Sequence, residues 1–235
     1  MHKKLTIWVP TKNRPDFLIR LFEYYKKTKF EGYLFIGDSS EGEKKEINEQ
    51  TIKKYEKYLN IYYCKFPNMP TGHVSSKLVP QIETEFSTNL SDDDVIMTPS
   101  INPCIEYLLQ NDTASGANGK SLLFETETNK AFGNILRTST YNLAKISNSN
   151  GKDRLKNIFS NMKSMNMCIL RTHNQKIIFE KVGKLSRLHS SYIFEELIGC
   201  VVMSVRGKIE QLPNLFLCTM DLLDISPYPY NIVDP

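Results

Sequence analysis

The sequence has few cysteines and histidines, and none of them is spaced as a zinc ligand. The cysteines are scattered and odd in number: Cys64, Cys104, Cys168, Cys200 and Cys218. Several lie within apolar runs, which is typical of buried free thiols in a reducing compartment. His73, His173 and His189 are interpreted as ordinary polar residues, because no spacing among them is that of a zinc site.

Long apolar runs and dense charge of one sign are also missing. The longest apolar run, Leu197–Val205, has about half of the length that a membrane-spanning helix needs, and Leu5–Val9 is too short for the core of a signal peptide. The net charge of +4 is too mild to indicate a nucleic-acid partner. Three lysine clusters are interpreted as solvated faces, with an anionic membrane surface as the alternative: Lys3–Lys4, Lys26–Lys29 and Lys53–Lys57. We expect a cytoplasmic protein with at most peripheral membrane contact.

Strand and helix patterns alternate in the first half of the chain. Leu5–Pro10, Tyr33–Gly37 and Ile61–Cys64 are compact apolar runs that predict strands. A helix is expected from Pro15, because apolar residues recur on one helical face at Phe17, Leu18, Leu21, Phe22 and Tyr25. A charged helix is expected over Glu43–Tyr58, with inward residues Ile47, Thr51, Tyr55 and Tyr58. This alternation predicts a single α/β domain with a parallel sheet and helices on its faces.

The second half of the chain is less regular. Pro99 begins an expected helix with apolar residues at Ile101, Ile105, Leu108 and Leu109. Thr113–Lys120 and Asn148–Asp153 are rich in Gly, Ser and Asn and are interpreted as loops. Asn166–Arg171 predicts a strand, and Phe194–Val205 predicts a buried helix that ends near Gly207. Two further expectations are a short helix near His73 and an extended tail over Ser226–Pro235.

Three consecutive aspartates, Asp92, Asp93 and Asp94, are the most informative feature of the chain. They follow the turn-like stretch Ser87–Ser91 and precede an apolar pair. Adjacent like charges repel one another, and a divalent cation would relieve that repulsion. Mg²⁺ and Mn²⁺ prefer carboxylate oxygens and keep open positions for substrate phosphates. The alternative, a solvated acidic turn, stays open from these residues alone.

The aspartates are one of three polar segments that are expected at strand ends. Thr11–Arg14 follows the first predicted strand, Asp38–Ser40 follows the second, and Asp92–Asp94 follows a later one. Ligands of parallel α/β sheets bind at the carboxyl ends of the strands. If the strands are parallel, the three segments therefore converge on one ligand site.

These motifs, in this order, resemble those of a known family. Val9-Pro10-Thr11-Lys12-Asn13-Arg14-Pro15, Gly37-Asp38-Ser39-Ser40 and Asp92-Asp93-Asp94 are similar to the motifs of nucleotide-sugar-dependent glycosyltransferases of the GT-A type. The resemblance is to family 2 and to small bacterial glycosyltransferase-domain proteins of surface polysaccharide clusters. It covers roughly residues 4–110 and continues weakly around Phe194–Leu212.

The resemblance implies a GT-A fold, with a Rossmann-like, mostly parallel sheet flanked by helices. One domain over residues 1–235 would divide into a donor-binding half, 1–110, and an acceptor-binding half with the C-terminal helix and tail, 111–235. The implied activity is metal-dependent, inverting transfer of a sugar from a nucleotide diphosphate donor, with UDP the expected nucleotide. The acceptor would be a bacterial surface glycan or a lipid-linked precursor, reached on the cytoplasmic face of the inner membrane.

The same resemblance implies a role for each matching residue. Pro10, Thr11, Asn13 and Arg14 would line the nucleotide site, Asp38 beside Ser39 would accept a hydrogen bond from the base, and Lys77 would pair with a phosphate. Asp92 would reach the ribose and the metal, Asp93 would lie beside the donor, and Asp94 would contact Mn²⁺ or Mg²⁺. Gly72, His73 and Ser76 also fall where relatives contact the donor. A surface lysine is the alternative interpretation of Lys77.

An inverting transferase needs a carboxylate that deprotonates the acceptor hydroxyl. Glu195 and Glu196 match the acidic position of the resembled family, and Glu195 is preferred because it lies nearer the expected start of its helix. The alternative is that both are solvated residues on the polar side of that helix.

Other functions are less compatible with the sequence. Nucleotidyltransferases usually carry a glycine-rich loop after the first strand, whereas Thr11–Arg14 contains no glycine. A two-metal phosphohydrolase needs a second cluster of acidic and His ligands, which the sequence does not contain. A degenerate fold that only binds or scaffolds is the remaining alternative, and the intact Asp92–Asp94 argues against it. The tryptophan motif of processive polysaccharide synthases is absent, and Trp8 is expected in the core.

Overall fold

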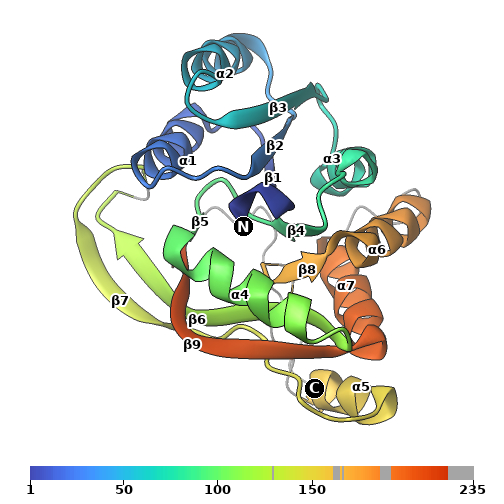
Figure 1. Cartoon of the computed structure of the whole chain (residues 1–235). Helices are drawn as coiled ribbons and strands as arrows, with labels where there is room; N and C mark the ends of the chain where they lie inside the picture. The colour runs from blue at the N-terminus through green and yellow to red at the C-terminus, as the bar shows by residue number, and fades with distance from the viewer. Residues whose placement is uncertain (129, 161–164, 166, 186–191, 222–235) are drawn as a thin grey trace, which may run out of the picture.

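The computed structural model describes residues 1–128, 130–160, 165, 167–185 and 192–221. In these residues nine strands form one sheet in the order β3-β2-β1-β4-β8-β6-β9-β5, with β7 paired to β6 (Figure 1). The central sheet is mostly parallel and is flanked by helices, as the sequence predicted. No helix in the described part of the chain is long and apolar enough to cross a membrane.

Four strands of the first half are parallel. β1 (Leu5–Thr11) lies between β2 (Tyr33–Asp38) and β4 (Phe86–Asn89), and β3 (Asn60–Lys65) pairs with β2. Thr11 is in register with Asp38, so β1 and β2 end at the same level. The side chains that follow these strands therefore start from one edge of the sheet.

The helices between these strands begin where local signals place them. α1 (Pro15–Lys27) has proline in its first turn, which suits a position that needs no amide hydrogen. α2 (Gly42–Tyr55) packs against α1, and α3 (Thr71–Leu78) packs against β1, β2 and α6. Two 3-10 turns complete this half, η1 (His2–Lys4) and η2 (Val79–Gln81).

The second half adds antiparallel pairs to the sheet. β6 runs antiparallel to β7 and β8 and parallel to β9, while β5 runs antiparallel to β9. The bounds are β5 Val95–Ile96, α4 Thr98–Gln110, β6 Ala114–Thr126, β7 Ile135–Tyr141, α5 Gly151–Ser160, β8 Ile169–Arg171, α6 Thr172–Leu185, α7 Tyr192–Arg206 and β9 Lys208–Met220.

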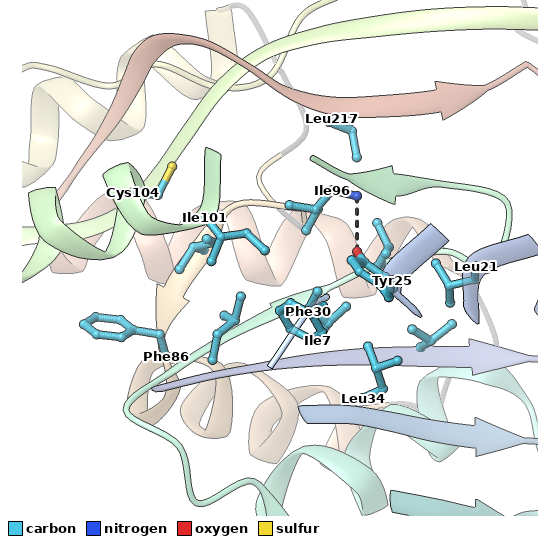
Figure 2. Packing of buried hydrophobic residues seen from close by; sticks show 14 of the residues in the cluster. Ile7, Leu21, Tyr25, Phe30, Leu34, Phe86, Ile96, Ile101, Cys104 and Leu217 are labelled. Atoms are coloured by element: carbon cyan, nitrogen blue, oxygen red, sulfur yellow. Dashed lines mark hydrogen bonds between the residues drawn. The ribbon is translucent and has the colours of Figure 1, made fainter. Parts of the chain in front are cut away.

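The core has two parts because successive side chains of a strand point to opposite faces of the sheet. Ile7 of β1 joins a cluster with residues of α1 and α4, and Figure 2 shows Leu21, Tyr25 and Ile101 gathered around it. The hydroxyl of Tyr25 also accepts a hydrogen bond of 3.3 Å from the Ile96 amide. The next residue, Trp8, belongs to the other cluster, so its predicted place in the core is confirmed.

The loop expected over Thr113–Lys120 is wrong, because most of this segment is the buried start of β6. The glycines of this segment allow the neighbouring strands to pack closely against it. A Cβ on Gly116 would meet the Leu170 side chain at 2.6 Å, and one on Gly119 would meet the Asn214 carbonyl oxygen at 2.4 Å. Small residues here let β6 lie between β8 and β9, whereas local composition alone favours a loop.

Other local expectations need smaller corrections. Tyr58 lies beyond α2 and is 52% exposed, and Leu109 is 37% exposed, so neither belongs to the core. The loop expected over Asn148–Asp153 runs into α5 at Gly151, where the Asn150 side chain accepts a hydrogen bond of 2.9 Å from the Asp153 amide. The strand expected over 166–171 contains only Ile169–Arg171, and residue 166 and the tail 226–235 lie outside the described residues.

Candidate active site

The three polar segments expected to converge are in contact. Thr11 donates from Oγ1 to Oδ2 of Asp92 at 2.6 Å, across 81 residues of sequence. The amide of Asn13 donates to Oγ of Ser40 at 2.7 Å, and the amide of Ser39 donates to the carbonyl oxygen of Thr11 at 2.9 Å. Asn13 has a φ of 58°, a left-handed conformation that asparagine tolerates better than most residues. The ends of β1 and β2 thus form one site with Asp92–Asp94, the acidic loop, and Pro10 is half-buried at the end of β1.

Arg14 provides a positive charge at this site. Its guanidinium bonds to Oδ1 of Asp92 at 3.0 Å and to Oδ2 of Asp93 at 2.8 Å. The same group lies 4.1 Å from the ring centroid of Phe17, a cation–π distance. Burial alone would lower the pKa of Arg14, but the charges of Asp92 and Asp93 offset it, so the pKa is raised.

The buried carboxyl groups resist ionisation. Burial is the largest influence on Asp92 and raises its pKa to about 6, although Arg14 and Thr11 favour the charged form. Burial also raises the pKa of Asp94 to about 7, and the charge of Asp93 acts in the same direction. Shifted pKa values of this kind are enriched at functional sites.

The structure adds Arg20, a residue that the sequence analysis missed. Nη2 of Arg20 donates to the carbonyl oxygen of Asp93 at 2.6 Å, and Nη1 donates to the carbonyl oxygen of Ala131 at 3.0 Å. Ala131 lies in the turn between β6 and β7 and packs with Phe17 and Met220. Arg20 therefore ties α1 to both the acidic loop and this turn. Its position on α1 carries no sequence signal, because its hydrogen-bond partners, two backbone oxygens and the Met220 sulfur, lie far along the chain.

The three aspartates differ in their surroundings. Asp94 is 2% exposed and accepts a hydrogen bond of 3.2 Å from the Met220 amide in β9, with Thr219 as a second partner. The side chains of Asp92 and Asp93 are 3% and 13% exposed. Asp93 is thus the carboxylate most open to solvent.

Asp92, Asp93 and Asp94 can hold a metal ion if other groups complete its coordination. In the described residues no three His, Cys, Asp or Glu side chains are grouped to hold a metal by themselves. Mg²⁺ sites commonly take one or two carboxylates and complete their coordination with substrate phosphates and water. Asp92, Asp93 and Asp94 therefore suit a metal that arrives together with a diphosphate.

Asp38 is held by protein donors on both of its oxygens. Oδ1 accepts from the Ser40 amide at 2.8 Å, and Oδ2 accepts from Nδ2 of Asn48 at 3.0 Å and from the hydroxyl of Tyr63 at 2.7 Å. The residue is 2% exposed. These bonds join β2, α2 and β3, so Asp38 shapes the Ser39–Ser40 turn whatever else it contacts. Neither Asn48 nor Tyr63 stood out in the sequence.

The remaining candidates lie on helices α3 and α7. On α3, His73 is half-buried and Lys77 is exposed. Because Lys77 is exposed, it can reach a ligand only from the surface. Glu195 and Glu196 belong to the first turns of α7, and Glu196 is half-buried one turn before Cys200, whose pKa its charge helps to raise. The main packing partners of α7 are α5, α6 and β6, with smaller contacts to α3 and β9. The described contacts do not bring Glu196 to the acidic loop.

Solved structures of other proteins have the same fold. No protein-family model matches the sequence, and no curated protein matches it significantly. TarS 1–349 of S. aureus superposes with a TM-score of 0.61 at 14% identity over 92% of this chain and 60% of that chain. PcManGT, a mannosyltransferase from Pyrobaculum calidifontis, superposes with a TM-score of 0.59 at 9% identity over 96% of this chain and 58% of that chain. The chain thus spans about 60% of the length of these neighbours.

The neighbours have been solved with nucleotides bound. TarS 1–349 is known in complex with UDP and with UDP-GlcNAc, and PcManGT in complex with GDP-Man and Mn²⁺. Both are glycosyltransferases of the GT-A type. The chain therefore has the GT-A glycosyltransferase fold that its motifs predicted.

Proposed function

We propose that the protein is a metal-dependent, inverting glycosyltransferase that uses a nucleotide diphosphate sugar, with UDP the expected nucleotide. The observation that carries this proposal is the contact of Thr11 and Arg14 with Asp92 and Asp93 at the end of parallel strand β1. Ligands of such sheets bind at this edge. Neighbours with this fold have been solved with UDP and with GDP-Man, which supports a nucleotide sugar as the donor.

In this proposal the chain's own groups prepare a diphosphate site. Thr11 holds one oxygen of Asp92, and Arg14 spans Asp92 and Asp93, so the carboxylates are oriented before the donor arrives. A bound Mn²⁺ or Mg²⁺ would supply positive charge to the leaving diphosphate, with Asp94 and Asp92 as its proposed ligands. Asp38 and the Ser39 turn would border the base. Lys77 would approach a phosphate from the surface of α3.

Residues 111–235 are proposed to bind the acceptor. Glu195, or Glu196 as the alternative, would take the proton of the acceptor hydroxyl as that oxygen attacks the anomeric carbon. A bacterial surface glycan or a lipid-linked precursor is the proposed acceptor. In that case the protein would work in the cytoplasm, with peripheral contact to the inner membrane. Residues 1–110 would form the donor half of a single domain.

Calorimetric titration with UDP, GDP, CMP and TDP, each with and without Mn²⁺, tests the proposal. Binding of one nucleotide that strengthens with Mn²⁺ is expected. The control variant Arg137→Gln should bind nucleotide as the wild type does, because Arg137 is an exposed arginine paired with Glu125 on the β6–β7 hairpin. Absence of binding for every nucleotide would instead favour a protein that keeps the fold as a scaffold.

A further inference from the structure

The guanidinium of Arg14 occupies the place where a cation would meet the acidic loop. It binds Oδ1 of Asp92 and Oδ2 of Asp93 at the same time. The remaining oxygen of Asp92 accepts the Thr11 hydroxyl, and one oxygen of Asp94 accepts the Met220 amide. A metal ion that binds Oδ1 of Asp92 or Oδ2 of Asp93 would therefore compete with Arg14 for the same oxygens.

Arg14 is also placed to move. It is the N-cap residue of α1, and its side chain is 32% exposed, far more than those of the aspartates that it binds. Beside it, the ring of Phe17 gives the guanidinium a flat surface. A guanidinium forms paired hydrogen bonds with phosphate as readily as with carboxylate. A diphosphate at this edge would therefore offer Arg14 a new anionic partner without a change in the backbone.

We infer that Arg14 is a positioning residue that neutralises Asp92 and Asp93 in the ligand-free protein and transfers to the donor diphosphate when the donor binds. This inference rests on the proposed function and deepens it. It makes metal binding conditional: the carboxylates accept a metal well only after Arg14 has moved to phosphate. Metal and nucleotide then bind with strong positive coupling, and metal alone binds weakly.

Two variants isolate the charge of Arg14. Arg14→Gln removes the charge but keeps a polar side chain, and Arg14→Lys keeps the charge but loses the paired geometry. Arg137→Gln is the matched control, because it makes the same substitution at an exposed arginine on the β6–β7 hairpin. Free Mn²⁺ is counted by electron paramagnetic resonance during titration of ligand-free protein, and again with UDP, or with GDP where the nucleotide titration selects it.

Arg14→Gln is expected to bind Mn²⁺ alone about tenfold more tightly than the wild type and to bind the nucleotide with Mn²⁺ at least about tenfold more weakly, because one charge-assisted contact is lost. Arg14→Lys should keep the weak binding of Mn²⁺ alone, and Arg137→Gln should match the wild type. The factor by which nucleotide improves Mn²⁺ affinity should shrink in Arg14→Gln, as reciprocal linkage requires.

In Arg14→Gln, the affinity for Mn²⁺ alone should rise while the affinity for nucleotide with Mn²⁺ falls. A merely structural role of Arg14 would lower both affinities. Unchanged or weaker binding of Mn²⁺ alone in Arg14→Gln overturns the inference, and so does wild-type coupling in that variant. Stronger binding of Mn²⁺ alone in both Arg14→Gln and Arg14→Lys also overturns it, since the charge would then be irrelevant. A wild-type protein that binds no nucleotide overturns the proposed function, whereas the titration of Mn²⁺ alone still reports on Arg14.

Discussion

The hydroxyl of Tyr63 in β3 donates a hydrogen bond of 2.7 Å to Oδ2 of Asp38, at the end of the neighbouring strand β2. Together with Asn48 and the Ser40 amide, it surrounds a carboxylate that is 2% exposed. The raised pKa of Tyr63, caused first by burial and then by Asp38, agrees with a hydroxyl that stays protonated as a donor. The base side of the proposed nucleotide site is thus held by a network that spans three elements.

Tyr63→Phe is expected to lower the free energy of unfolding by roughly 1–3 kcal/mol, because a buried carboxylate loses a donor. Urea denaturation measures the change. Tyr62→Phe is the matched control on the same strand, since Tyr62 is 44% exposed and its hydroxyl bonds to Gln81 at the surface. Equal losses in the two variants would show that the Asp38 network does not contribute specifically to stability.

Arg20→Gln is expected to weaken Mn²⁺-dependent nucleotide binding, because Arg20 holds the Asp93 backbone and the Ala131 turn in place. The loss in unfolding free energy should be roughly 1.5–3 kcal/mol, the range for hydrogen bonds to charged groups. Calorimetry and thermal unfolding measure the two effects. Arg137→Gln, on the β6–β7 hairpin, should leave nucleotide binding as in the wild type. Wild-type affinity in Arg20→Gln would mean that the acidic loop keeps its geometry without this residue.

The ligand-free protein is expected to lose stability as the pH rises from about 4 to about 7. The pKa of Asp94 is raised to about 7 in the folded state, against about 3.9 in the unfolded chain. Over this interval the folded state binds more protons than the unfolded state, so unfolding becomes easier with rising pH. Asp92, with its pKa raised to about 6, adds to the effect.

Asp94→Asn should reduce this pH-dependent loss by an amount on the order of 2–4 kcal/mol. Thermal unfolding at pH 5, 6, 7 and 8 compares the variant with the wild type. Asp16→Asn, an exposed substitution on α1, is the control and should follow the wild-type profile. A pH profile of Asp94→Asn that parallels the wild type would show that Asp94 ionises as readily in the folded protein as in the unfolded chain.

Glu195→Gln is expected to retain donor affinity and to lower the rate of transfer by roughly 10²–10⁴-fold, because the acceptor hydroxyl keeps its proton. The measurement is sugar transfer with the donor that calorimetry selects, alongside nucleotide affinity. Glu196→Gln is the paired variant on the same helix. If Glu196→Gln loses transfer and Glu195→Gln does not, the preference between the two is wrong; if both transfer normally, the base lies elsewhere.

Local pattern was sufficient for much of the fold. The apolar stripe from Phe17 to Tyr25, with proline at the helix start, predicts α1 because helical periodicity and the first-turn preference depend on neighbours only. The run Leu5–Pro10 predicts β1 for the same reason, and alternation of strands with helices restricts the first half of the chain to parallel strands. Convergence of Thr11, Asp38 and Asp92 follows from that topology.

The parts of the fold and of the site that local pattern did not predict depend on packing between distant segments. The glycines of 113–120 predict a loop locally, yet Gly116 and Gly119 let β6 pass close to β8 and β9. The sequence could name Asp94 as a ligand candidate, but only the fold places it against Met220, 126 residues later. Arg14 precedes α1 and was named from its motif, whereas Arg20 lies in the middle of the same helix and was missed. Their roles differ because tertiary packing presents carboxylates to Arg14 and backbone oxygens to Arg20.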